Sequence, residues 1–287
     1  MGKPHSNQNF QDWITQQWVI RFGKKINPKQ NEWLLGPFGK TDGIGEKFIQ
    51  QLAEKENLVI DKSNHKKGLL QSINQLNLTE EEQNELSKEV IDFYENTGNY
   101  NLDLDVKWNP YFRMFGGLLK ILFSNRIEQL NIPMDNQENS NKLKSEIIQL
   151  IDEKSQTVKR IVWLRTFIES KQVVYSGVYE TCTIPSGRTC IKAIFPLPNG
   201  SATVILNPSV GKKGELILNS SGKKIGDSGF YFLLQDAQNN VWAKFVKSFK
   251  DELIVCSKNE KITAIQTLTL WNLKVLTFTY NIQKLNK

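Results

Sequence analysis

Six basic and aromatic residues in the second half of the chain have the types and spacing of a small-molecule binding site. They are Arg165, Tyr175, Tyr179, Lys192, Trp242 and Lys244. Residues two or four apart on a β-strand share a face, so Tyr175 lies with Tyr179, and Trp242 lies with Lys244. Aromatic walls with a few basic groups suit an amphipathic or anionic ligand. In the alternative interpretation, the rings only fill a core and the lysines face water.

A second hypothesis is acid–base catalysis by carboxylate and tyrosine side chains of the first half. Asp42, Tyr94, Glu95 and Arg113 lie in aromatic-rich stretches, where burial can raise the pKa of a carboxyl group. No nucleophile-elbow, kinase, zincin or cysteine–histidine pattern accompanies them. No catalytic residue is assigned, and it stays open whether the protein is an enzyme.

Metal and cofactor chemistry have little support in the sequence. The two histidines, His5 and His65, lie in polar stretches, so we expect no metal site. The glycine-rich stretch 36–45 lacks the Lys-Ser/Thr ending of a phosphate loop, so we expect no cofactor. Cys182, Cys190 and Cys256 fit reduced thiols better than a disulfide framework, and the first two flank a turn that could bring them face to face.

Charge is divided unevenly between the two halves. Residues 1–155 hold 19 Lys and Arg against 22 Asp and Glu, a net −3, whereas residues 156–287 hold 18 against 8, a net +10. Such a field attracts anionic small molecules or an anionic membrane surface. Nucleic acid is not expected as a partner, because no nucleic-acid-binding module pattern is present. A solubilising surface is the alternative interpretation.

The first half reads mainly as helices. Residues 9–22 place aromatic side chains at helical spacing, and residues 77–94 begin with a capping pattern before an apolar stripe. Residues 100–108 alternate like a half-buried strand. The apolar stretch 111–123 predicts a helix that is either buried or held in a membrane interface. Residues 135–153 predict a loop and a connecting surface helix.

The second half reads as eight to ten short strands separated by Gly, Pro, Asn and Lys turns. This pattern of short strands and turns predicts an antiparallel β-barrel or β-sandwich, with a lipocalin-like up-and-down barrel favoured. The fold class is therefore α+β, with a mainly helical region at 1–155 and a basic β-barrel domain at 156–287. A small barrel of this kind can enclose one ligand, so we expect the site in its interior.

The sequence lacks two features that would place the protein in or across a membrane. No apolar run approaches the roughly 18 to 20 uncharged residues that span a bilayer, and the first residues do not resemble a secretory signal. We expect a cytoplasmic protein, with a peripheral membrane position as the alternative.

Three short motifs resemble those of a set of bacterial proteins without an assigned biochemical role. They are the Trp33-Leu34-Leu35-Gly36-Pro37 stretch that runs on to Gly45, then Phe93-Tyr94-Glu95 with Thr97, and Phe195-Pro196-Leu197-Pro198. The resemblance extends over most of the chain. It implies a bacterial cytoplasmic setting and carries over no catalytic residue.

Overall fold

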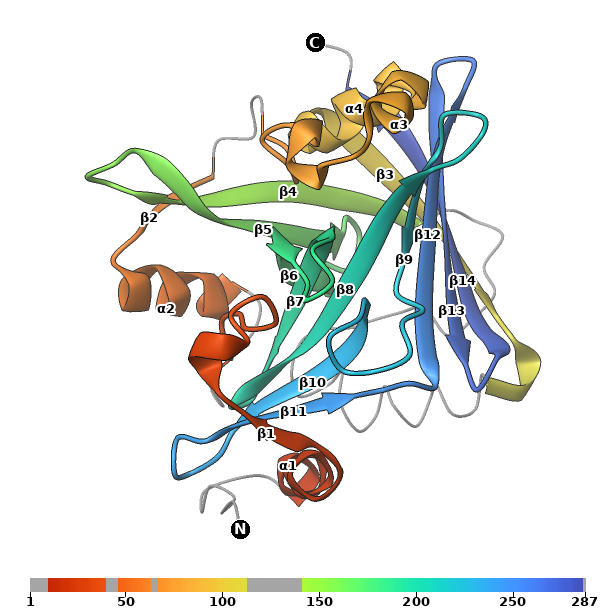
Figure 1. Cartoon of the computed structure of the whole chain (residues 1–287). Helices are drawn as coiled ribbons and strands as arrows, with labels where there is room; N and C mark the ends of the chain where they lie inside the picture. Colours follow the sequence, from red (N-terminus) through yellow and green to blue (C-terminus); the bar gives the residue numbers. More distant parts are fainter. Residues whose placement is uncertain (1–9, 40–45, 63–66, 113–140, 286–287) are drawn as a thin grey trace.

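Ten antiparallel strands close into a β-barrel in the part of the chain that the structure describes (Figure 1). The computed structural model describes residues 10–39, 46–62, 67–112 and 141–285. The barrel closes where β14 pairs with β3 and where β9 joins β8 to β12, so the predicted α+β class with an antiparallel barrel is confirmed. The barrel strands are β3 (Tyr100–Trp108), β4 (Asn141–Asp152), β5 (Thr157–Phe167), β6 (Val173–Thr183), β7 (Thr189–Leu197), β8 (Gly200–Val210), β9 (Leu216–Asn219), β12 (Phe249–Lys258), β13 (Lys261–Leu270) and β14 (Leu273–Lys284).

Apolar and polar side chains alternate along the strands, and closure of the barrel buries the apolar face of each strand. In β3, Leu102, Leu104 and Val106 are buried, whereas Asn101 and Lys107 are exposed, which confirms the strand predicted at 100–108. The long run predicted to break near residue 271 is the hairpin of β13 and β14.

A small side sheet leaves the barrel at β8. The first half of β8 pairs with β10 (Gly229–Gln235) and its second half pairs with β9 along the same edge. The sheet continues through β11 (Val241–Phe245) to β1 (Lys24–Ile26). Helix α1 (Phe10–Phe22), predicted at 9–22, packs on this sheet through Trp18, whose ring meets the Phe232 ring edge-on at 5.6 Å.

Two short helices, α3 (Glu80–Glu85) and α4 (Lys88–Glu95), cover one end of the barrel (Figure 1). Thr79 caps α3 through a reciprocal capping box with Glu82, as the sequence predicts. The single helix predicted over 77–94 is wrong, because Leu86 adopts an extended conformation between the two helices. The Ser87 amide then donates to the Gly214 carbonyl oxygen at 3.0 Å in the β8–β9 turn.

Helix α2 (Glu46–Glu56) covers the outer face of β4, β5 and β6. Its Phe48, Ile49 and Leu52 pack on outward side chains such as Ile148 and Val162. The surface helix predicted within 135–153 is wrong, since residues 141–152 form β4. Under α2 the strand is buried on both faces, so its apolar residues lose the alternation that marks an ordinary strand.

The predicted boundary after residue 155 falls between β4 and β5, which pair along their whole length. Two barrel strands, β3 and β4, therefore come from the region predicted as helical.

No helix among the described residues is long and apolar enough to cross a lipid bilayer. Most of the apolar helix predicted at 111–123 lies outside the described residues. The remaining short elements are η1 (Pro28–Gln30), β2 (Val59–Asp61), η2 (Ile73–Leu76) and η3 (Thr97–Asn99).

Candidate functional site

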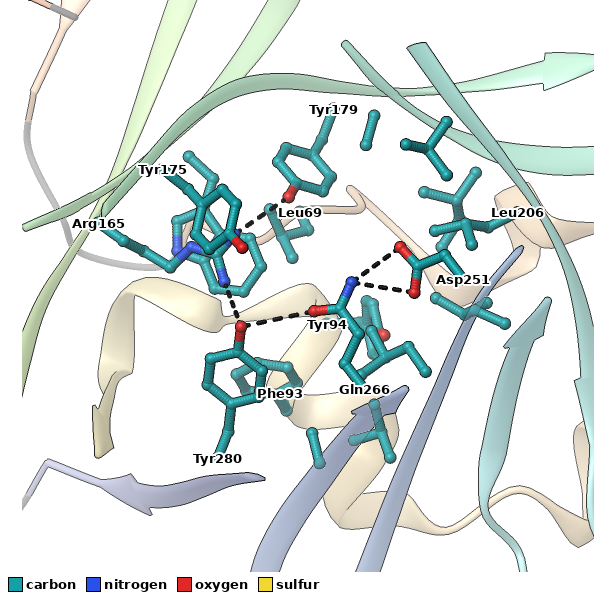
Figure 2. Close-up of a pocket in the computed structure, with 18 of the residues that line it drawn as sticks. Leu69, Phe93, Tyr94, Arg165, Tyr175, Tyr179, Leu206, Asp251, Gln266 and Tyr280 are labelled. Atoms are coloured by element: carbon teal, nitrogen blue, oxygen red, sulfur yellow. Dashed lines mark hydrogen bonds between the residues drawn. The ribbon is translucent and has the colours of Figure 1, made fainter. Parts of the chain in front are cut away.

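The barrel encloses a cavity of about 80 Å³, bounded at one end by α4. One water molecule needs about 10 to 15 Å³ of such space, so the cavity has room for several waters or one small organic molecule. Most of its wall is apolar, from residues such as Leu102, Val204 and Leu253. Polar side chains converge on it from several strands (Figure 2): Arg165, Tyr175, Tyr179, Asp251, Gln266 and Tyr280.

Strand parity and register position these groups. Trp163 and Arg165 share the inward face of β5, and Arg165 pairs directly with Tyr175 on β6. Tyr179 follows Tyr175 four residues later, on the same face. From the other side of the barrel, β12 contributes Asp251, β13 contributes Gln266 and β14 contributes Tyr280.

The guanidinium of Arg165 is a buried cation whose positive charge is only weakly balanced by neighbouring groups. Its side chain is enclosed, with the residue 5% exposed, and no carboxylate of the described residues lies within salt-bridge distance. Its terminal nitrogens donate only long hydrogen bonds, at 3.4 Å to the Tyr280 hydroxyl and 3.5 Å to the Tyr179 hydroxyl. The Nε atom has no hydrogen-bond partner among the described residues.

Aromatic rings supply the rest of the support for this cation. The guanidinium carbon lies 4.1 Å from the ring centroid of Trp163 and 4.5 Å from that of Tyr175. Cation–π contacts of this kind stabilise a desolvated guanidinium by about 2 kcal/mol, which is less than the several kcal/mol that burial of an ion costs. Arg165 is therefore held in place but not neutralised.

The tyrosines around Arg165 are hydrogen-bond donors at neutral pH. Burial holds the pKa of Tyr175, Tyr179 and Tyr280 above the usual range, so their hydroxyls keep their protons. Neutral hydroxyls beside a guanidinium can donate to an anion that the guanidinium attracts.

A hydrogen-bonded chain joins Arg165 to the buried carboxyl group of Asp251 (Figure 2). The Gln266 side-chain nitrogen donates to both Asp251 oxygens, at 2.8 and 3.0 Å, and the Tyr280 hydroxyl donates to the Gln266 oxygen at 3.5 Å. Burial raises the pKa of Asp251 to about 7. The charge of the cavity therefore changes near neutral pH.

The structure brings three of the six predicted ligand-binding residues to this cavity: Arg165, Tyr175 and Tyr179. Lys192 lies on the other face of β7, where its amine donates to the Leu35 carbonyl oxygen at 2.6 Å and lies 3.5 Å from Glu180. Trp242 and Lys244 belong to the side sheet. Trp242 donates to Asp236 at 2.9 Å, and the Lys244 amine lies 5.8 Å from the Trp18 ring centroid.

Of the four residues predicted for acid–base chemistry, Tyr94 and Glu95 lie in the described part of the chain. Tyr94 lines the cavity from α4, and burial raises its pKa. Glu95 instead accepts a hydrogen bond from the Ile73 amide at 2.7 Å. Asp42 and Arg113 lie outside the described residues.

Sequence reasoning missed four residues that contact Arg165 or join its hydrogen-bonded chain: Trp163, Asp251, Gln266 and Tyr280. Trp163 could have been found, because it lies two residues before Arg165 on the same strand. The other three come from the last three strands, and only the closure of the barrel brings them opposite β5 and β6.

The two cysteines expected to face each other do so, since Cys182 and Cys190 are directly paired across β6 and β7. Both are free and buried, and burial raises the pKa of Cys182 to about 11 and that of Cys190 to about 12. In the described part of the chain, no group of three or more His, Cys, Asp or Glu side chains could hold a metal ion.

Comparison with curated proteins finds a relative in Bacillus subtilis (strain 168) named "Uncharacterized membrane protein YndJ". It is 25% identical over 272 residues, which cover 94% of this chain and 46% of the relative. The chain thus spans about half the length of that relative. No family model and no solved structure matches the sequence.

Proposed function

We propose that the barrel binds a small anionic molecule, with Arg165 as its anchor. The observation that carries the proposal is a buried guanidinium with no carboxylate partner among the described residues and an unpartnered Nε–H group. A buried charge is ordinarily paired, and a buried unsatisfied polar group calls for a specific explanation. A carboxylate or phosphate would supply both the missing charge and the missing hydrogen-bond acceptor.

The cavity also limits the size and shape of the ligand. Its volume of about 80 Å³ is well below the roughly 300 Å³ at which drug-sized pockets begin. Its wall is mainly apolar away from Arg165. These features favour a small organic acid or a compact phosphate, with the anionic group on Arg165 and any short apolar part against the leucine and valine side chains.

The test combines native mass spectrometry of the purified protein with calorimetric titration of formate, acetate and inorganic phosphate. The central variant is Arg165→Met, which removes the charge and keeps the aliphatic length. Arg160→Met is the matched control, because Arg160 lies on the same strand but is paired outside the barrel with Glu56 and Glu180. We expect the first variant to lose anion binding and the second to keep it.

Folding is checked separately by thermal unfolding. Arg165→Met should be at least as stable as the wild type, since it removes a buried cation that lacks an ionic partner. Undiminished anion binding by Arg165→Met would overturn the proposal. So would the absence of both a co-purifying molecule and any titration signal in the wild type.

Two finer proposals concern architecture and location. A lipocalin-like arrangement is supported by neighbouring strands that follow chain order, interrupted where β10 and β11 leave the barrel. The Bacillus subtilis relative is named a membrane protein, and this supports a working position at a membrane as a second proposal for this chain. The acid–base hypothesis gains no comparable support.

A further inference from the structure

Exposed aromatic side chains gather at one end of the molecule. Of the large apolar side chains that are exposed in the described residues, the aromatic ones are Trp13, Phe22, Tyr111 and Trp271. The first two belong to α1, and Trp271 forms the β13–β14 turn, which lies at the same end of the molecule as α1 and away from α3 and α4 (Figure 1). Tyr111 lies close by, since the preceding Asn109 donates to the Lys274 carbonyl oxygen at 2.7 Å.

A row of half-buried rings connects α1 to this turn. Trp18 of α1 meets Phe232 at 5.6 Å between ring centroids, Phe232 meets Phe230 at 5.1 Å, and Phe230 meets Phe249 at 4.7 Å. Phe249 pairs with Leu270, beside Trp271. We call α1, this row and the β13–β14 turn the aromatic end. These contacts link α1 to the β13–β14 turn across two parts of the sheet.

Apart from Asp12 in the first turn of α1, the charges in the sequence of these segments are positive. Residues 13–31, 244–250 and 270–275 contain no Asp or Glu. Basic residues with exposed side chains flank the exposed rings on both sides: Arg21, Lys24, Lys25 and Lys29 near α1, and Lys247 and Lys274 near the β13–β14 turn. A surface of this kind attracts a polyanion.

The β13–β14 turn holds its tryptophan in an unusual backbone conformation. Trp271 has φ 50° and Asn272 has φ 64°, the left-handed region that two-residue hairpin turns require. Asn and Gly adopt this region readily, whereas a bulky aromatic residue there is strained. The fold therefore keeps Trp271 exposed, at 67%, at some cost to local stability.

We infer that the aromatic end docks on the surface of an anionic lipid bilayer. Tryptophan and tyrosine rings partition to the interface between lipid and water, and each nearby Lys or Arg adds attraction to acidic headgroups. The rings lie on separate projecting elements, α1 and a hairpin turn, which suits a flat, deformable surface better than a fitted protein partner. A single-stranded nucleic acid would also be attracted to this positively charged surface. The experiment below distinguishes it from a lipid bilayer.

The experiment is sedimentation of the full chain with vesicles of phosphatidylcholine, with and without about one third phosphatidylglycerol. The charge variant is Lys24→Glu with Lys25→Glu. Its matched control is Lys212→Glu with Lys213→Glu, another exposed adjacent pair, in the β8–β9 turn on the opposite side from α1 (Figure 1). We expect the first pair to weaken binding to acidic vesicles about tenfold or more, and the control pair to change it little.

The aromatic contribution is tested by Trp271→Asn. Asn tolerates the left-handed backbone, so this variant should fold at least as stably as the wild type while its vesicle binding falls about tenfold. Ile168→Ser is its control, because Ile168 is also exposed, at 45%, but lies outside the aromatic end.

Three outcomes would overturn the inference. The first is sedimentation that is independent of phosphatidylglycerol, and the second is equal weakening by both lysine pairs. The third is binding to a single-stranded oligonucleotide with no binding to acidic vesicles, which would reassign this surface to nucleic acid. The inference does not depend on the cavity, so Arg165→Met should bind vesicles like the wild type.

Discussion

The charge inside the barrel depends on whether Asp251 is ionised. Of the charged residues that line the cavity, Arg165 stays positive, and the Glu180 carboxylate pairs with Arg160 and Lys192. With its pKa raised to about 7 by burial, Asp251 is largely neutral at pH 6 and largely ionised at pH 8. The cavity thus goes from net positive toward neutral across that interval.

Anion binding at Arg165 should therefore strengthen as the pH falls. We expect the affinity for acetate to be about tenfold higher at pH 6 than at pH 8, an effect of roughly 1.4 kcal/mol of repulsion by ionised Asp251. Asp251→Asn should remove the dependence and bind at pH 8 as the wild type does at pH 6. Calorimetric titration at both pH values checks this, and an unchanged pH profile in the variant would contradict it.

The same carboxyl group should make the fold less stable at pH 7 and above than it is near pH 4. Because the pKa of Asp251 rises from 3.8 in the unfolded chain to about 7 in the fold, the folded protein binds more protons between these values. Stability then decreases as the pH rises through this window, by up to about 4 kcal/mol. Asp251→Asn should be more stable than the wild type at pH 8 and no more stable near pH 4.

Urea denaturation at pH 4 and pH 8 measures this difference, with Glu153→Gln as an exposed control. A gain of equal size at both pH values would show that the effect is one of packing and not of ionisation.

At the scale of single residues, the sequence could show which side chains share a strand face but not which face is inside. Arg165, Tyr175 and Tyr179 lie on the inner faces of adjacent strands, and their types alone suggested a site. Lys192 has the same character, yet its neighbours Ile191 and Ala193 face the cavity instead. Which face of a strand points into the barrel depends on how all the strands pair, and the sequence of one strand seldom reveals it.

At the scale of elements, α2 shows how a covering helix changes the pattern of the strands below it. Phe48, Ile49 and Leu52 bury the outer face of β4 to β6, and this produced the helix-like spacing that misled the prediction for 141–152. Among the elements predicted well, β3 shows the regular period of 2 that a single covered face gives.

Removing the main contact of α2 should therefore destabilise the barrel wall. Phe48 is 2% exposed, so we expect Phe48→Ala to lower the free energy of unfolding by about 3 to 5 kcal/mol. Lys47→Ala is the control, because Lys47 is exposed on the same helix. Denaturant titration measures both, and similar losses in the two variants would contradict the packing described for α2.

At the scale of the whole molecule, the barrel needs strands from both halves of the sequence. β3 and β4 lie between β14 and β5, so a fragment of residues 156–287 would leave two long open edges. Unpaired edges of this length expose backbone donors and acceptors and favour association over folding.

We expect the fragment 156–287 to lack a cooperative unfolding transition and to aggregate, whereas the full chain should unfold cooperatively. Circular dichroism during heating, together with size-exclusion chromatography, distinguishes the two. A monomeric fragment 156–287 with a sharp transition would instead support the predicted boundary as the limit of an independent domain.

The junction at β8 has a consequence for how the molecule opens. One edge of β8 pairs with β7, and the other is shared between β10 and β9, so nearly the whole strand is hydrogen-bonded on both sides. Its amide hydrogens should be among the last to exchange with deuterated water. The side sheet and the barrel share β8, so unfolding of this one strand would open both.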